Sequence, residues 1–141
     1  MLARVMSLGI SGINGFPVAV EVDRSGGMPG FDVVGLPDAS VKESRERVRS
    51  ALRNSGMEYP VGHYTINLAP ADMKKEGPSF DLPIAVGVLV CAEAISQSSL
   101  DGVMMSGELA LSGAVNMING ALPMAIAARE LGYKRLILPR G

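Results

Sequence analysis

The sequence contains one cysteine and no apolar run long enough to cross a membrane. The lone cysteine, Cys91, excludes a disulfide framework and a zinc site built from cysteines. Because disulfides are rare in reducing compartments, this cysteine usage favours a cytoplasmic protein. No uninterrupted apolar stretch approaches the ~18 residues of a membrane span, and glycines interrupt the N-terminus too early for a signal peptide. We therefore expect a cytoplasmic location and no membrane partner.

Tryptophan is absent, aromatic residues make up only 4% of the chain, and neither sign of charge dominates. With 13 basic and 14 acidic residues, the formal net charge is -1, which argues against a domain that grips nucleic acid by its overall charge. The few tyrosines and phenylalanines form no obvious platform on which bases could stack. Any contact with nucleic acid must therefore come from a local group of charges.

The chain also lacks the pattern G-x-x-x-x-G-K-[ST], whose glycine-rich backbone and lysine bind nucleotide phosphates. The loop at 25–30 is rich in glycine, but it has no lysine and precedes a predicted strand. His63 is the only histidine, so the sequence has no second histidine that could complete a metal site. The sequence predicts no cofactor and no metal in this chain.

What is present is a chain of 141 residues, 48% of them hydrophobic, which suits a single folded domain over 1–141. Asn14-Gly15 between two apolar runs predicts a hairpin turn, and Ser112-Gly113 predicts a second turn. We expect helices at 37–54, 82–95 and 121–131, and strands at about 4–12, 16–23, 31–36, 64–68, 103–105, 109–118 and 135–138. Strands and helices alternate from residue 31 onward. This order predicts an α/β fold with a mixed sheet, β-hairpins and right-handed βαβ crossovers.

The first predicted helix has an apolar side and a basic side. Ser40 followed by Glu43 predicts a capping box at its start. Its apolar face is formed by Val41, Val48, Ala51 and Leu52. Four cations recur at three- and four-residue steps and so share a side of the helix: Lys42, Arg45, Arg49 and Arg53.

We call these four cations the basic stripe, and three interpretations of it remain open. Like charges four residues apart mildly oppose helix formation, so an external anion would stabilise the stripe. That anion could be the phosphates of DNA or an acidic face of a neighbouring subunit. Alternatively, the stripe is simply a solvated face. Lys74 and Lys75 are further candidates for the same surface.

Ser79 lies in the segment KEGPSFDLPIA, in a Gly-Pro turn just before an apolar run. A serine at a helix start is placed where a nucleophile would find N–H groups to stabilise an oxyanion. The same position suits an ordinary helix cap. Asp81 would oppose the ionisation of a nearby serine, which favours the cap.

The turn at Ser79, together with GELALSGAV and the loop at 119–121, resembles the proteolytic domain of Lon-type proteases. In that family the serine of such a turn is the nucleophile, and a lysine after such a loop is its base. Here the position that matches the lysine is Leu122. The small residues that follow the serine in that family are replaced by Phe80 and Asp81. The resemblance thus implies a shared fold and leaves Ser79 without its usual base.

A longer set of motifs resembles the N-terminal domain of magnesium-chelatase-like AAA+ ATPases of the ComM/YifB type: GFDVVGLPDASVKESRERVRSAL, TINLAPADMKKEGPSFDLPIA and GELALSGAV. The resemblance implies a fold shared with ribosomal-protein and Lon-like domains. It also implies a longer polypeptide with an ATPase module that uses ATP and Mg²⁺, forms a hexamer and acts on DNA during transformation. The chain would then be a non-catalytic accessory domain that supplies subunit contacts.

Two other functions remain open at this point. One is a serine hydrolase of the Lon-like kind, using Ser79 with an unusual base. The other is RNA binding, which only the shared ribosomal fold suggests, and a fold alone is weak support for a function.

Overall fold

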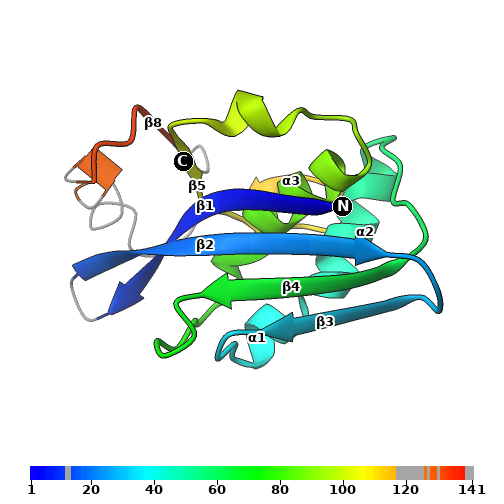
Figure 1. The fold of residues 1–141 in the computed structure, drawn as a ribbon, viewed down its shortest axis with the longest axis horizontal. Coiled ribbons are helices and arrows are strands. Elements are labelled where there is room, and N and C mark those ends of the chain that lie inside the picture. The colour runs from blue at the N-terminus through cyan, green and yellow to red at the C-terminus, as the bar shows by residue number, and fades with distance from the viewer. Residues whose placement is uncertain (12–13, 117–125, 127, 130, 139–141) are drawn as a thin grey trace.

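The computed structural model describes residues 1–11, 14–116, 126, 128–129 and 131–138. Figure 1 shows one sheet with helices packed behind it. The strands are β1 (Leu2–Ser11), β2 (Asn14–Ser25), β3 (Gly30–Val34), β4 (His63–Ala69), β5 (Val103–Met105), β6 (Glu108–Leu109), β7 (Val115–Asn116) and β8 (Arg135–Ile137). The helices are α1 (Ala39–Lys42), α2 (Ser44–Asn54) and α3 (Asp81–Cys91), with 3-10 turns η1 (Pro78–Phe80) and η2 (Gln97–Leu100).

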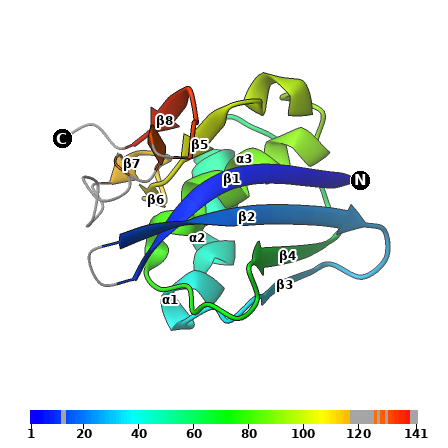
Figure 2. The same cartoon turned by 60° about the vertical axis from the view of Figure 1, so that its left-hand side comes forward.

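The main sheet has six strands in the order β3-β4-β2-β1-β5-β8. Strands β1 and β2 form an antiparallel hairpin, and β2 also pairs with β4 in the antiparallel sense. The pairs β3–β4, β1–β5 and β5–β8 are parallel. Strands β6 and β7 form a separate small antiparallel sheet, which lies beside the main sheet in Figure 2. The mixed α/β fold predicted from the sequence is confirmed.

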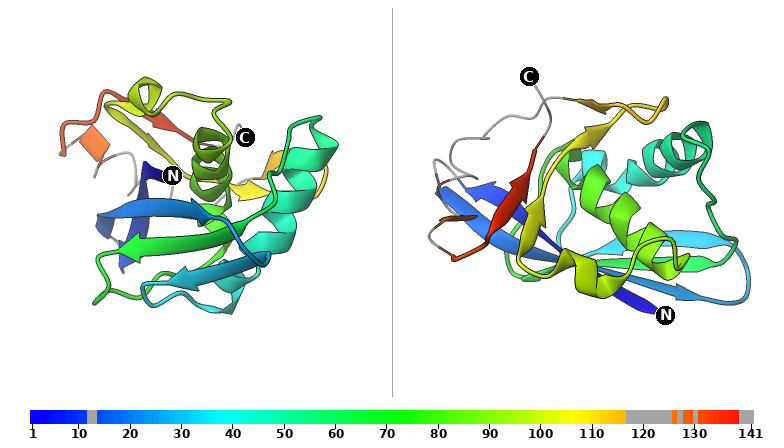
Figure 3. Two further views of the ribbon diagram at one scale, coloured as in Figure 1. Left: turned by 45° about the vertical axis from the view of Figure 1, so that its right-hand side comes forward. Right: turned by 90° about the horizontal axis from the view of Figure 1, so that it is seen from above.

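The core fills the space between the inner face of the sheet and the helices, which Figure 3 shows on one side of the strands. Alternate residues of β2 and β4, such as Val20 and Ile66, are fully buried and face α3. Helix α3 is apolar on nearly every side, which matches its position between the sheet and α2. A smaller cluster on the other face of the sheet is built on Leu8, Met104 and Ala128. The lone cysteine, Cys91, is buried in the main core.

Several element boundaries differ from the prediction. Ser11 pairs with Asn14, so Asn14-Gly15 belongs to β2 instead of forming the predicted turn. Helix α3 ends at Cys91, because Glu93 adopts a positive φ of 61° and the chain leaves the helix there. Within the predicted strand region 109–118, the predicted turn at Ser112-Gly113 is confirmed and joins the short strands β6 and β7. The predicted helix 121–131 falls largely outside the described residues.

The first predicted helix is interrupted at Glu43, which separates α1 from α2. Its cap also differs from the prediction. The carboxylate of Asp38 accepts a hydrogen bond from the backbone N–H of Val41 at 2.9 Å, and this makes Asp38 the N-cap. Glu43 makes no capping hydrogen bond with its side chain, so the predicted Ser40–Glu43 capping box was wrong. The predicted apolar face is confirmed, since its four residues are buried against the core.

Candidate functional site

The two longest sequence motifs meet at the loop between β3 and α1. The N–H of Lys75 donates to the carbonyl of Leu36, and the N–H of Asp38 donates back to the carbonyl of Lys75, both at 2.9 Å. The second oxygen of the Asp38 carboxylate accepts from the N–H of Gly77, also at 2.9 Å. Asp38 therefore joins the start of α1 to the segment that leads into α3. The two motifs form one structural unit, although the residues that these hydrogen bonds join lie almost 40 positions apart in the chain.

The β3–α1 loop holds two consecutive residues in left-handed conformations, Gly35 with φ 101° and Leu36 with φ 56°. Gly35 is required there, because a Cβ atom would overlap the backbone carbonyl of Leu68. Leu36 has no such freedom, and a non-glycine residue at positive φ costs of the order of 1–2 kcal/mol. The side chain of Leu36 is nevertheless 52% exposed. The loop therefore stores strain while it presents an apolar side chain to solvent.

Asp81, at the start of α3, is fully buried and lies at the centre of a polar network. One carboxylate oxygen accepts from Arg47 Nε at 2.6 Å and from the N–H of Leu109 at 3.1 Å. The other accepts from Ser44 Oγ at 2.9 Å and from Arg47 Nη2 at 3.1 Å. The network ties α2, α3 and β6 together. Its role is structural, because all four donors belong to the packed domain.

The electrostatics of this pair reflect both burial and contact. Burial raises the pKa of the Asp81 carboxyl, and the hydrogen bonds from Arg47, Leu109 and Ser44 offset part of that rise. The hydrogen bond to Asp81 raises the pKa of the Arg47 guanidinium. Arg47 also donates to the backbone carbonyl of Ser40, which links α2 to α1.

Ser79 lies inside the 3-10 turn η1 and takes part in the fold through its backbone. Its carbonyl accepts from the N–H of Gly107 at 2.8 Å and from Ser106 Oγ at 3.3 Å. The residue that precedes α3 is Phe80, and no side chain caps that helix. The expectation that the Ser79 hydroxyl caps the helix was therefore wrong. Asp81 is directed into the buried network, so it opposes Ser79 less directly than the sequence suggested.

The two lysines before the turn point to different environments. Lys75 is fully buried, and its ammonium donates to the carbonyl of Pro70. Burial lowers the pKa of Lys75. Lys74 is exposed and lies 3.5 Å from the carboxylate of Glu76. Lys75 therefore does not belong to an exposed basic surface. The ammonium groups of Lys74 and Lys75 contact Glu76 and Pro70, and neither of these contacts involves Ser79.

The basic stripe runs along the outer side of α1 and α2. Lys42, Arg45 and Arg53 are exposed, and the ion pairs of the described residues include none of the three. Arg49 is less available, because its guanidinium lies 3.0 Å from Glu46. The three arginines share one neighbourhood beside Tyr59, since each of them offsets part of the rise that burial causes in the pKa of that phenol. The structure thus brings the three arginines of the stripe together beside Tyr59, whereas Lys42 lies on α1 beside β3.

Sequence reasoning missed the Asp81 network and the strained loop. The partner of Asp81 is Arg47, 34 residues away in the chain, and no local pattern connects them. A usable pattern did exist for Asp38, which is an alternative cap two residues before Ser40. The position that matches the Lon lysine, Leu122, lies outside the described residues. In the described part of the chain, no helix combines the length and the apolar character that a membrane crossing needs.

Comparisons with known proteins place these motifs in a family. Residues 20–141 match the family described as subunit ChlI of Mg-chelatase. The chain is 49% identical over 126 residues to the uncharacterized protein YifB of Escherichia coli K12. This match covers 89% of this chain and 25% of that protein. It is 45% identical over 129 residues to competence protein ComM of Haemophilus influenzae, covering 92% of this chain and 25% of that protein.

The likeness to Lon is weaker. The chain is 35% identical over 99 residues to Lon protease 2 of Bacillus subtilis, and the match covers 70% of this chain and 17% of that protease. The chain spans about a quarter of the length of its YifB and ComM relatives.

Proposed function

Because the chain belongs to the family of subunit ChlI of Mg-chelatase, with relatives of the YifB and ComM type, we propose that it is a non-catalytic accessory domain of an ATPase that acts on DNA. One relative, competence protein ComM of Haemophilus influenzae, is by its name linked to competence. We extend this link to the present chain as part of the proposal. The domain would supply contacts between subunits and a basic surface that faces DNA.

The observation that carries the proposal is the basic stripe on one side of α1 and α2. Lys42, Arg45 and Arg53 are exposed cations, and Arg49 extends the row between them. Guanidinium groups on one side of a helix suit contacts with phosphates, and such contacts ignore base sequence. The formal charge of -1 limits what one copy achieves alone. Several copies held in a ring would add their contacts through effective concentration.

The remaining parts of the proposed assembly lie outside these residues. Since the chain spans about a quarter of its relatives, we place the ATPase module, with its ATP and Mg²⁺, in the remainder of a longer polypeptide. This chain contains no phosphate-loop pattern, so we assign nucleotide binding to that remainder. The proposed assembly is a cytoplasmic hexamer.

A serine hydrolase based on Ser79 is the weaker candidate. Its support is the likeness to Lon protease 2. Against it, the ammonium of Lys75 is bound to the Pro70 carbonyl, and that of Lys74 lies beside Glu76. Neither lysine is arranged as the base that a serine nucleophile needs.

The proposal is tested by measuring DNA affinity at low salt for the intact protein and for an Arg45→Gln/Arg53→Gln variant. A matched control, Arg4→Gln/Arg135→Gln, removes two exposed arginines on β1 and β8, away from the stripe. We expect weaker DNA binding for the first variant only, with an unchanged oligomeric state. Equal losses in both variants would contradict a DNA-facing stripe. A loss of assembly with normal affinity per assembled particle would assign the stripe to a subunit interface instead.

A further inference from the structure

We propose that the free edge of β3 accepts an extended acidic peptide segment of a partner protein, which adds to the sheet as a further strand. This site includes Lys42 of the basic stripe but none of the arginines that carry the proposed DNA contact. Strand addition needs an edge with unpaired backbone groups, room beside it and side-chain pockets that select the peptide. Strand β3 provides each of these.

The edge is open. Among the described residues, β3 pairs only with β4 and therefore ends the six-stranded sheet. The N–H of Gly30 donates toward β4, to the carbonyl of Gly62. Because successive peptide groups of a strand point to opposite sides, the N–H and C=O groups of Phe31 and Val33 point away from β4. These groups form the ladder that an added strand would complete.

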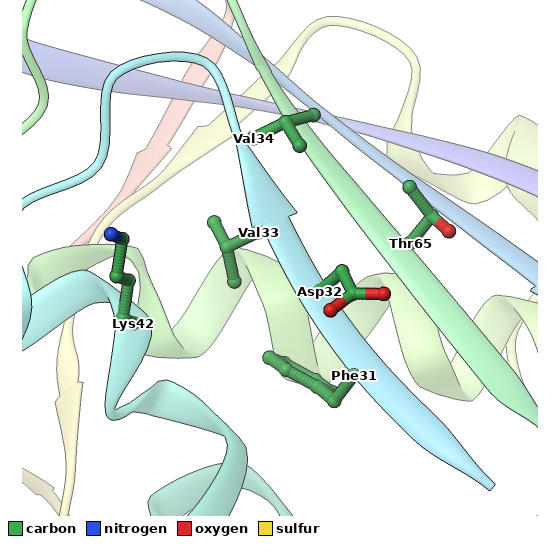
Figure 4. Close-up of a pocket in the computed structure, with 6 residues that line it drawn as sticks. All are labelled: Phe31, Asp32, Val33, Val34, Lys42 and Thr65. Atoms are coloured by element: carbon green, nitrogen blue, oxygen red, sulfur yellow. The ribbon is translucent and has the colours of Figure 1, made fainter.

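A hollow of about 590 Å³ surrounds this edge. Its lining residues come from both faces of the sheet: Phe31, Asp32, Val33, Val34, Lys42 and Thr65. Figure 4 shows β3 running between Lys42, which projects from α1, and Thr65 on β4. A hollow with walls on both faces leaves room for the side chains of an added strand, which alternate between the faces.

The end of β3 displays apolar side chains that the domain does not cover. Val34 is 48% exposed, and Leu36 is 52% exposed. Leu36 is held in its strained left-handed conformation by backbone hydrogen bonds on both sides of Lys75. Strain of this kind persists where the surrounding structure imposes it and is concentrated at functional positions. An apolar residue of the peptide would cover Val34 or Leu36.

The charges select the partner. On the helix side of the edge, Lys42 lines the hollow and is an exposed cation outside the described ion pairs. An acidic side chain of the peptide would lie against it. A second copy of this chain is disfavoured, because antiparallel pairing of two β3 strands places two Asp32 carboxylates on one face. The same twofold contact would set Lys42 against its own copy.

The test uses two capped ten-residue peptides, in which valine alternates with glutamate or with lysine. Binding is followed by amide chemical shifts of the isotope-labelled chain. We expect saturable binding of the glutamate peptide, with shifts centred on Phe31 and Val33, and binding of the lysine peptide at least about tenfold weaker, a factor equivalent to about 1.4 kcal/mol. No saturation by the glutamate peptide up to millimolar concentration, or equal affinity for both peptides, would overturn the proposal.

Variants test the contacts separately. Lys42→Glu should weaken the glutamate peptide by about tenfold, whereas the matched control Lys134→Glu, beyond the opposite edge of the sheet, should leave it within about twofold. Val33→Pro removes an outward N–H and should abolish binding, while Val33→Ala keeps that N–H and should retain it. If Val33→Pro does not fold, comparing Lys42→Glu with Lys134→Glu still tests whether the peptide binds at this edge. A dimer whose β3 amides become protected with protein concentration would contradict the proposal.

Discussion

Replacing Asp81 by asparagine tests whether the buried network holds α2, α3 and β6 together. Each carboxylate oxygen accepts two hydrogen bonds, and Arg47 donates to both oxygens. Whichever way the asparagine amide is turned, its NH₂ group meets an Arg47 N–H. The substitution therefore leaves a largely buried guanidinium without its counter-charge and with a donor facing a donor.

The magnitude follows from burial. Removing one partner of a buried ion pair costs about 3–5 kcal/mol, chiefly because the other charge is left uncompensated. The side chain of Arg47 retains 19% exposure, so solvent relieves part of this cost. We expect a loss of about 3 kcal/mol in the free energy of unfolding, which would lower the Tm of a domain of this size by roughly 10 °C.

Urea unfolding followed by circular dichroism measures this loss. The matched control is Asp101→Asn, an exposed carboxylate that should change stability by less than about 0.5 kcal/mol. A double variant, Asp81→Asn/Arg47→Met, removes both charges and should be less destabilised than the sum of the single variants, by about 1–3 kcal/mol. A loss below about 1 kcal/mol for Asp81→Asn, or simple additivity in the double variant, would refute this account of the network.

Three further predictions concern single positions. Ser79→Ala should change stability by less than about 0.5 kcal/mol, because the fold uses the Ser79 carbonyl, and a serine-reactive phosphonate should leave the chain unlabelled; stoichiometric labelling at Ser79 would revive the hydrolase. Burial lowers the pKa of Lys75, so between that pKa and the ordinary value near 10.4 the unfolded chain binds the extra proton. In this pH window the free energy of unfolding of the wild type should therefore rise relative to that of Lys75→Met. Parallel pH profiles for the two proteins would contradict a lowered pKa for Lys75. Gly35→Ala should cost more than about 2 kcal/mol in urea unfolding, because its Cβ meets the Leu68 carbonyl at positive φ, and a loss below about 1 kcal/mol would show that the loop adjusts.

The sheet and its core could be predicted because their patterns are local. Alternation along β2 and β4 marks one buried face, and the mixed character of the sheet follows from the alternation of strands and helices along the chain. The apolar run of α3 likewise predicts a buried helix. Boundaries were less accurate where two residues compete for one role, as Asp38 and Ser40 do for the N-cap.

The candidate site could be predicted only in part, because its decisive contacts are long-range. The basic stripe follows from helical periodicity alone. Lys74 and Lys75 are neighbours in sequence, and only the packing of Lys75 beneath the Pro70 carbonyl separates a buried cation from an exposed one. The positive φ of Leu36 is equally invisible in sequence, since it is imposed by hydrogen bonds to a segment almost 40 residues away.

The salt dependence of DNA binding tests the proposed DNA-facing role most directly. If Arg45 and Arg53 each meet a phosphate, Arg45→Gln/Arg53→Gln should reduce the slope of log K against log salt by roughly 1.4–1.8, at 0.7–0.9 for each contact. Arg49→Gln should reduce the slope less than Arg45→Gln or Arg53→Gln alone, because Glu46 already pairs with the Arg49 guanidinium. The change should be the same for DNA of different sequences. An unchanged slope in the double variant, with DNA still bound, would contradict the account and leave the stripe as a solvated face.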